Sequence, residues 1–213
     1  MQAVIDAIDA LASWNYLMHW RHIVAVPCDA GAVNRLKARH DAASRFRSIR
    51  WHDENPFRTV GGAYSELVGL ALAYSAFDYM RDVVFRIGPR DWKGRRAFYA
   101  TLDLSPLSSP LESAHVYYPN RAFQLALSGM VNPFLSASLV DADNPFERIH
   151  VGEALRHTFV HGKLSPSGGV FEPNTLQQIC QEYRIGLLEV VTRQMMATVH
   201  DPIIEMIYGG LSD

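Results

Sequence analysis

One short run of the chain places an arginine and two histidines within six positions, in the sequence Gly152-Glu-Ala-Leu-Arg-His-Thr-Phe-Val-His-Gly-Lys-Leu-Ser-Pro166. Histidine, with a usual pKa of about 6.5, can take up or release a proton near neutral pH. Arginine carries a permanent charge on a planar group whose donors fit a phosphate. These residue types therefore suit proton transfer beside a phosphate group.

The spacing of these residues also allows two other interpretations. At roughly 100° per residue, Arg156 and His161 point about 140° apart on a helix and would bracket a groove, whereas His157 and His161 share a face. Basic residues at the end of a helix can simply oppose its dipole and bind its last carbonyls. The two histidines could instead bind zinc, with His150 or His115 as a third ligand, although Thr158 stands where zinc hydrolases have a glutamate.

The same run resembles the Arg-x(4-6)-His signature of the HEPN superfamily, in which the motif lies on an interior helix of an all-α bundle. Arg156 matches the arginine, His157 the polar residue that follows it and His161 the histidine, and Gly162 and the segment 165–166 are also similar. The resemblance implies an endoribonuclease that needs no metal or cofactor and leaves 2′,3′-cyclic phosphate ends, since RNA supplies its own nucleophile in the 2′-hydroxyl. It also implies that His161 moves the proton, Arg156 holds the phosphate and His157 is a supporting donor. It equally allows a catalytically silent relative that dimerises and binds RNA, a nucleotide or a protein.

A homodimer is the oligomeric state that this chemistry favours. One chain supplies one Arg156 and one His161 from the motif, whereas in-line cleavage profits from both a base and an acid. A two-fold axis would place two copies of each residue side by side. The resemblance further implies a toxin or defence effector, for which an antitoxin or regulatory protein would be a partner.

The elements that must position this motif are helical. Leu67 to Ile87 carries apolar residues at helical spacing, so we expect a core helix that starts near Ser65 and Glu66, after a loop containing Gly61 and Gly62. Within it, Asp78 is expected to pair with Arg81 or with solvent, and could alternatively orient a motif residue. Further helices are expected over residues 4–26, 32–49 (polar and on the surface), 92–102, 121–139 and 146–160, and from Asn174 to about Met195.

Between these helices the sequence predicts irregular connections. Residues 105–110 are expected to be extended, and residues 163–171 to form a short hairpin or ordered loop before the last long helix. The predicted fold class is therefore an all-α, multi-helix bundle. We expect a single domain over residues 1–213, with a HEPN-like core at about 65–200 and the N-terminal helices packed on it.

The composition excludes several classes of protein. The net charge of -2 and pI of about 6.5 disfavour a broad basic surface that coats nucleic acid. Cys28 and Cys180 are too few for a disulfide framework or a four-cysteine zinc site. The sequence lacks the run of about 18 apolar residues that a membrane span needs. A cytoplasmic protein without membrane contact is expected.

Overall fold

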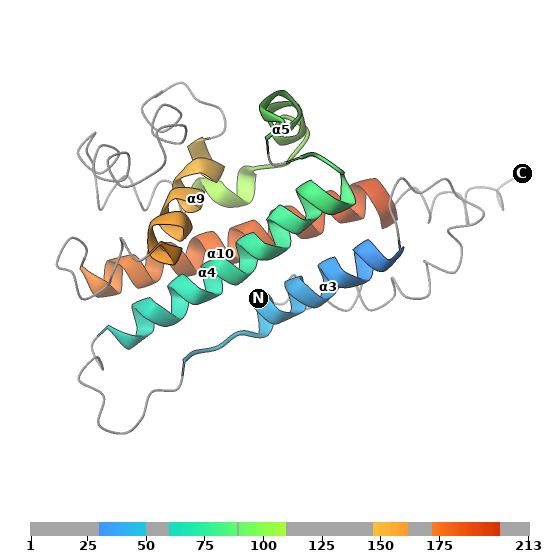
Figure 1. The fold of residues 1–213 in the computed structure, drawn as a ribbon. Helices are drawn as coiled ribbons and strands as arrows, with labels where there is room; N and C mark the ends of the chain where they lie inside the picture. Colours follow the sequence, from blue (N-terminus) through green and yellow to red (C-terminus); the bar gives the residue numbers. More distant parts are fainter. Residues whose placement is uncertain (1–29, 50–59, 89, 110–146, 162–171, 201–213) are drawn as a thin grey trace, which may run out of the picture.

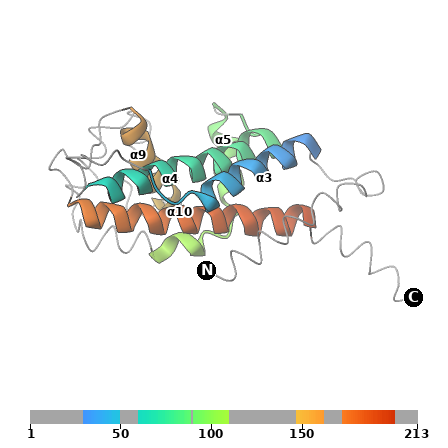
Figure 2. The same cartoon turned by 90° about the horizontal axis from the view of Figure 1, so that it is seen from below.

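The computed structural model describes residues 30–49, 60–88, 90–109, 147–161 and 172–200. Within these ranges the chain forms five α-helices and no strand, which confirms the all-α, multi-helix fold class. Figure 1 shows two long helices, α4 and α10, running side by side, with α3 along one side of the pair and α9 crossing on the other. The same pairing of α4 with α10 is visible in the view from below (Figure 2).

Helix α4 spans Gly61–Tyr79 and continues as a π-helical turn over Met80–Val84. The expected start near Ser65 is therefore wrong by one turn, and the predicted loop at Gly61 and Gly62 is instead the first turn of the helix. Gly62 faces α10, since a Cβ at this position would lie 2.2 Å from Oε1 at the end of the flexible Gln177 side chain. Tertiary packing of this first turn overrides the low helix propensity of glycine.

Helix α10 spans Pro173–Met195 and is followed by a second π-helical turn, Met196–His200. Its cap is Glu172, whose side chain accepts a hydrogen bond from the backbone N–H of Thr175 at 2.7 Å, so the expected cap at Asn174 is wrong by two positions. The apolar stripe of α10 packs along α4 and forms the centre of the core. Its buried members include Leu176, Ile179, Cys180, Tyr183, Leu187, Val190, Val191 and Met195.

Helix α3 spans Ala30–Arg45 and lies against both α4 and α10. The sequence predicted a surface helix here, but one face is buried and contains Val33 and Leu36. His40 lies on this face, within hydrogen-bond distance of the Leu188 carbonyl (3.3 Å) and the Thr192 hydroxyl (3.1 Å). Burial, as the main cause, lowers the pKa of His40, so a neutral imidazole joins α3 to α10.

The remaining described elements are shorter than the central pair. Helix α5 spans Trp92–Tyr99 and is capped by the side chain of Asp91. A 3-10 turn, Ser105–Leu107, replaces the extended connection that the prolines suggested, and Leu107 is fully buried. Helix α9 spans Glu147–Val160, close to the predicted 146–160. No helix in the described ranges is long and apolar enough to cross a membrane.

Several predicted elements lie outside the described residues. They are the first helix over 4–26, the helix over 121–139 and the hairpin or ordered loop over 163–171.

Candidate functional site

Helix α9 is held against α4 and α10 by a close approach at Gly152. A Cβ at this position would lie 2.7 Å from the hydroxyl oxygen of Tyr74 and 2.8 Å from a ring carbon of Tyr183. The Tyr74 hydroxyl donates a 2.7 Å hydrogen bond to the carbonyl of Ile149, which binds α9 to α4 at the same point. Because the contact involves buried aromatic rings, the position of α9 on α4 is fixed one turn before Arg156.

Arg156 points from α9 towards α4 and forms an ion pair there. Its Nη2 lies 3.1 Å from Oδ2 of Asp78, and its guanidinium carbon lies 5.6 Å from the centre of the Tyr74 ring. Both charged side chains keep contact with solvent, with 29% of Arg156 and 22% of Asp78 exposed. Asp78 therefore does orient a motif residue, as the sequence had allowed.

His157 and His161 lie together at the C-terminal end of the same helix. Their ring centres are 4.2 Å apart, with the ring planes inclined by 53°, which confirms that the two residues share a helix face. The backbone N–H of His161 donates to the carbonyl of His157 at 3.0 Å, so His161 still belongs to the last turn. His161 is exposed and His157 half-buried. The structure thus pairs the two histidines with each other, and Arg156 with Asp78.

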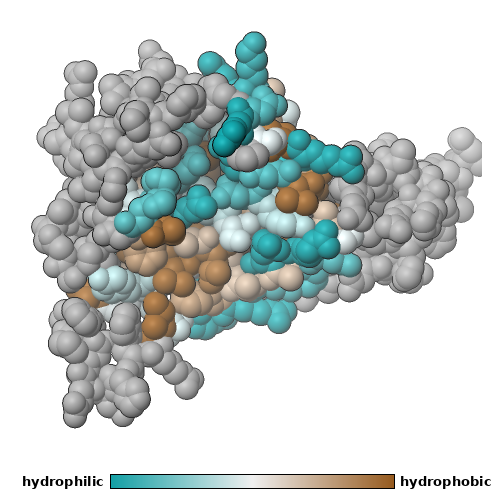
Figure 3. Space-filling view, in the orientation of Figure 1, coloured by the Kyte–Doolittle hydropathy of each residue, from teal (hydrophilic) through white to brown (hydrophobic). Residues whose placement is uncertain are grey.

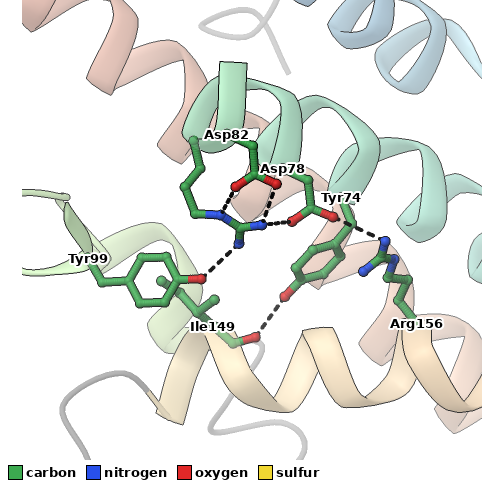
Figure 4. A network of polar contacts seen from close by, with 7 residues as sticks. Tyr74, Asp78, Asp82, Tyr99, Ile149 and Arg156 are labelled. Atoms are coloured by element: carbon green, nitrogen blue, oxygen red, sulfur yellow. Dashed lines mark hydrogen bonds and ion pairs between the residues drawn. The ribbon is translucent and has the colours of Figure 1, made fainter. Parts of the chain in front are cut away.

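The ion pair of Arg156 is one end of a longer row of charged groups (Figure 4). The other carboxylate oxygen of Asp78, Oδ1, lies 3.0 Å from Nη2 of Arg81. Arg81 also donates to both oxygens of Asp82, at 2.6 and 3.1 Å, and to the hydroxyl of Tyr99 at 2.9 Å. The order of contacts is therefore Arg156, Asp78, Arg81 and Asp82.

The π-helical turn at the end of α4 carries Arg81 and Asp82. The backbone N–H of Phe85 bonds to the carbonyl of Met80, five residues earlier, as a π-helical turn requires. Arg81 is only 3% exposed. Burial of its guanidinium opposes the charge, but the hydrogen bond to Asp82 and the neighbouring Tyr99, Asp78 and Asp82 raise its pKa above the usual value. Arg81 is a permanently charged group inside the fold.

Glu153 lies near the same cluster, one turn before Arg156 on α9. Burial, followed by the negative charge of Asp78, raises the pKa of its carboxyl group, while Arg81, Arg95 and Arg156 act in the opposite direction. The site therefore collects carboxylates and guanidinium groups from α4, α5 and α9. Clusters of this kind, with perturbed titration, are typical of functional sites but also occur as structural networks.

His150 marks the buried end of α9 and does not join the two motif histidines. It is 1% exposed, and its ring meets that of Tyr99 edge-on, with centres 6.2 Å apart. Burial, with a smaller effect of Arg95, lowers its pKa to about 4. The zinc alternative gains no support, because the described residues contain no group of three or more candidate ligands, and His115 lies outside them.

Sequence reasoning missed Tyr74, Asp82 and Tyr99 as members of this site. Asp82 could have been found from its position beside Arg81, but nothing in the spacing of Tyr74 or Tyr99 points to α9. Comparison with family models, with curated proteins and with solved structures found no match to this chain. The function is therefore inferred from the residues and geometry of the site.

Proposed function

We propose that this chain is a HEPN-like, metal-independent endoribonuclease that acts as a homodimer, in the role of a toxin or defence effector. The observation that carries the proposal is the arrangement of α9. Asp78 holds the guanidinium of Arg156 at the helix surface, and the exposed His161 ends the same helix. A phosphate-binding cation and an imidazole that can transfer a proton are thereby presented on one rigid element.

The reaction needs no group beyond the substrate and these side chains. Neutral His161 removes the proton of the 2′-hydroxyl, whose oxygen attacks the adjacent phosphorus. The bond from phosphorus to the 5′-oxygen breaks, and the leaving oxygen takes a proton from the protonated histidine of a second copy. The products are a 2′,3′-cyclic phosphate and a 5′-hydroxyl. Arg156 stabilises the negative charge that builds up on the phosphate oxygens.

An apolar surface beside the motif supports the proposed dimer. Figure 3 shows apolar side chains gathered over the first half of α4, next to the C-terminal end of α9. Val160 is the last residue of α9 and lies between His157 and His161 in the sequence, and its side chain is 60% exposed. Phe159 beside it packs against Tyr64, with ring centres 6.4 Å apart. Val160 is one of three exposed large apolar side chains in the described residues, with Val83 and Ile185, and we take it as a contact of the proposed dimer. A second copy bound there would bring two motifs close together.

The proposal is tested by cleavage of a mixed single-stranded and structured RNA pool in EDTA. Wild type is expected to cut and to leave cyclic phosphate ends, while His161→Ala and Arg156→Ala each lose at least about a hundredfold in rate, as expected for removal of a proton-transfer or charge-stabilising group. Arg193→Ala is the matched control, because Arg193 also forms ion pairs, with Asp103 and Glu189, but lies outside the motif. Equal activity in wild type and both motif variants would refute the assignment.

The second candidate is a catalytically silent HEPN-like module that dimerises and binds RNA, a nucleotide or a regulatory protein. The net charge of -2 favours it, as does the ion pair that Arg156 already makes with Asp78. This candidate predicts RNA or nucleotide binding that depends on Arg156 without any cleavage. Fluorescence anisotropy with a labelled oligonucleotide, run beside the cleavage assay, separates the two.

A further inference from the structure

The charged groups next to Arg156 share their contacts unequally. Each carboxylate oxygen of Asp78 contacts a different arginine. Oδ2 lies 3.1 Å from Arg156, and Oδ1 lies 3.0 Å from Arg81. Arg81 in turn binds Asp82 through two nitrogens, Nε and Nη2. The row contains two arginines and two aspartates, so its formal charges cancel. Because Asp78 is shared with Arg81, Arg156 has no carboxylate of the row to itself.

The two arginines at Asp78 differ in how firmly they are held. Arg81 is 3% exposed and is fixed by Asp78, Asp82 and Tyr99. Arg156 is 29% exposed, and its ion pair with Asp78 uses Nη2. A guanidinium has five N–H donors, so Arg156 can keep this contact and still present donors to an oxyanion.

We propose that Arg81 and Asp82 are positioning residues that set how much positive charge Arg156 presents to a phosphate group. Arg81 also pairs with Asp78 and offsets part of its negative charge. Asp78 therefore orients the guanidinium of Arg156 without fully neutralising it. Asp82 limits this effect because it competes with Asp78 for Arg81. The inference rests on the proposed function in that it names the ligand of the same site, a phosphate oxyanion, but it concerns binding and not cleavage.

The competition predicts the sign of a substitution that does not touch Arg156. Asp82→Asn removes one negative charge but keeps an oxygen that can accept from Arg81, so the local fold is preserved. Arg81 is then shared more strongly with Asp78, and Arg156 binds phosphate more tightly. For a partly exposed ion pair the expected gain in affinity is about twofold to fivefold.

The experiment is a titration of the full chain with inorganic phosphate, observed through the NMR signal of the Arg156 Nε–Hε group. In wild type this signal is expected to shift with phosphate, and in Asp82→Asn the midpoint moves to a lower phosphate concentration. Asp41→Asn is the matched control, since Asp41 is a similarly half-buried carboxylate, paired with Lys37 on α3. Its midpoint stays at the wild-type value, which separates a local effect from a change in net charge.

A second substitution tests whether the effect passes through Arg81. Arg81→Lys keeps the charge but lacks the planar fork that holds two carboxylates at once. In that background Asp82→Asn is expected to change the midpoint less than it does in wild type. An undiminished change overturns the role of Arg81, and equal midpoints for wild type and Asp82→Asn overturn the proposal even if Arg81→Lys does not fold. If phosphate moves the Arg156 signal as expected while RNA stays uncut, only the nuclease proposal fails.

Discussion

The buried His150 makes a quantitative prediction about stability and pH. Its pKa falls to about 4 in the folded chain, through burial and then the charge of Arg95, whereas an unfolded histidine titrates near 6.5. Between these values the unfolded chain binds a proton that the folded chain does not. The stabilisation is therefore fully present above about pH 6.5 and is lost as the pH falls towards 4. With about 1.4 kcal/mol for each pKa unit, the full difference is about 3 kcal/mol, of which about 2 kcal/mol falls between pH 7 and pH 4.5.

The perturbation is His150→Phe, with His150→Gln as a second variant. Phenylalanine keeps a ring against Tyr99, and glutamine keeps a polar side chain, but neither titrates in this range. Either change can alter packing and so the absolute stability. That cost is the same at both pH values, so it cancels when the loss of unfolding free energy between pH 7 and pH 4.5 is compared.

The assay is urea unfolding followed by circular dichroism at the two pH values. Wild type is expected to lose about 2 kcal/mol more than either variant on acidification. The lowered pKa of His40 also contributes a loss, but it is present in all three proteins and drops out of the comparison. If wild type and both variants lose the same free energy, His150 does not exclude its proton in the folded state, and the account of its burial is refuted.

Three substitutions test how the helices are packed around the site. Gly152→Ala places a methyl group against Tyr74 and is expected to lower the unfolding free energy by about 1–3 kcal/mol, measured by urea titration. Tyr74→Phe removes the hydrogen bond to the carbonyl of Ile149 and should cost about 0.5–1.5 kcal/mol in the same assay. Gly186→Ala brings a Cβ to 2.5 Å from the backbone oxygen of Pro106, which cannot rotate away, so the melting temperature should fall by at least about 2 °C.

Gly88→Ala is the control for both glycine variants, because a Cβ at Gly88 would meet no atom within 4 Å. Its stability should stay within about 0.5 kcal/mol of wild type. A loss at Gly88 as large as that at Gly152 would show that close packing against Tyr74 is not the cause of the loss at Gly152.

Local patterns in the sequence predicted most of the helices. The apolar stripes of α4 and α10 are long and regular, α9 was placed from the loop before it and the glycine after it, and all three positions agree with the structure within about one turn. The buried face of α3 escaped notice because Val33 and Leu36 are its only large apolar members, and its other members are small or polar, as with Ala43 and His40. The start of α4 was missed because Gly61 and Gly62 are usual in loops, and the contact of Gly62 with α10 is not visible in the local sequence.

The candidate site could be predicted only as far as one helix extends. The pairing of His157 with His161 follows from their i, i+4 spacing. The ion pair of Arg156 with Asp78 joins two helices that are far apart in sequence, so its formation depends on how α9 crosses α4. The sequence predicted the pairing of Asp78 with Arg81, three residues away on the same helix, which the structure confirms. It offered the pairing with a motif residue only as an alternative, and Asp78 makes both.

The π-helical turn at Met80–Val84 governs how a change in chain length affects this segment. Such a turn contains one residue more than the α-helical turn it replaces. Deleting one residue there, such as the exposed Val83, would allow α4 to continue as a regular helix while Asp78 and its upstream residues keep their places. Every position after the deletion would then keep nearly its present direction about the helix axis, because the residue lost is the extra one of the π-helical turn. The chain should therefore tolerate the loss of Val83 better than the loss of a residue from the α-helical part of α4.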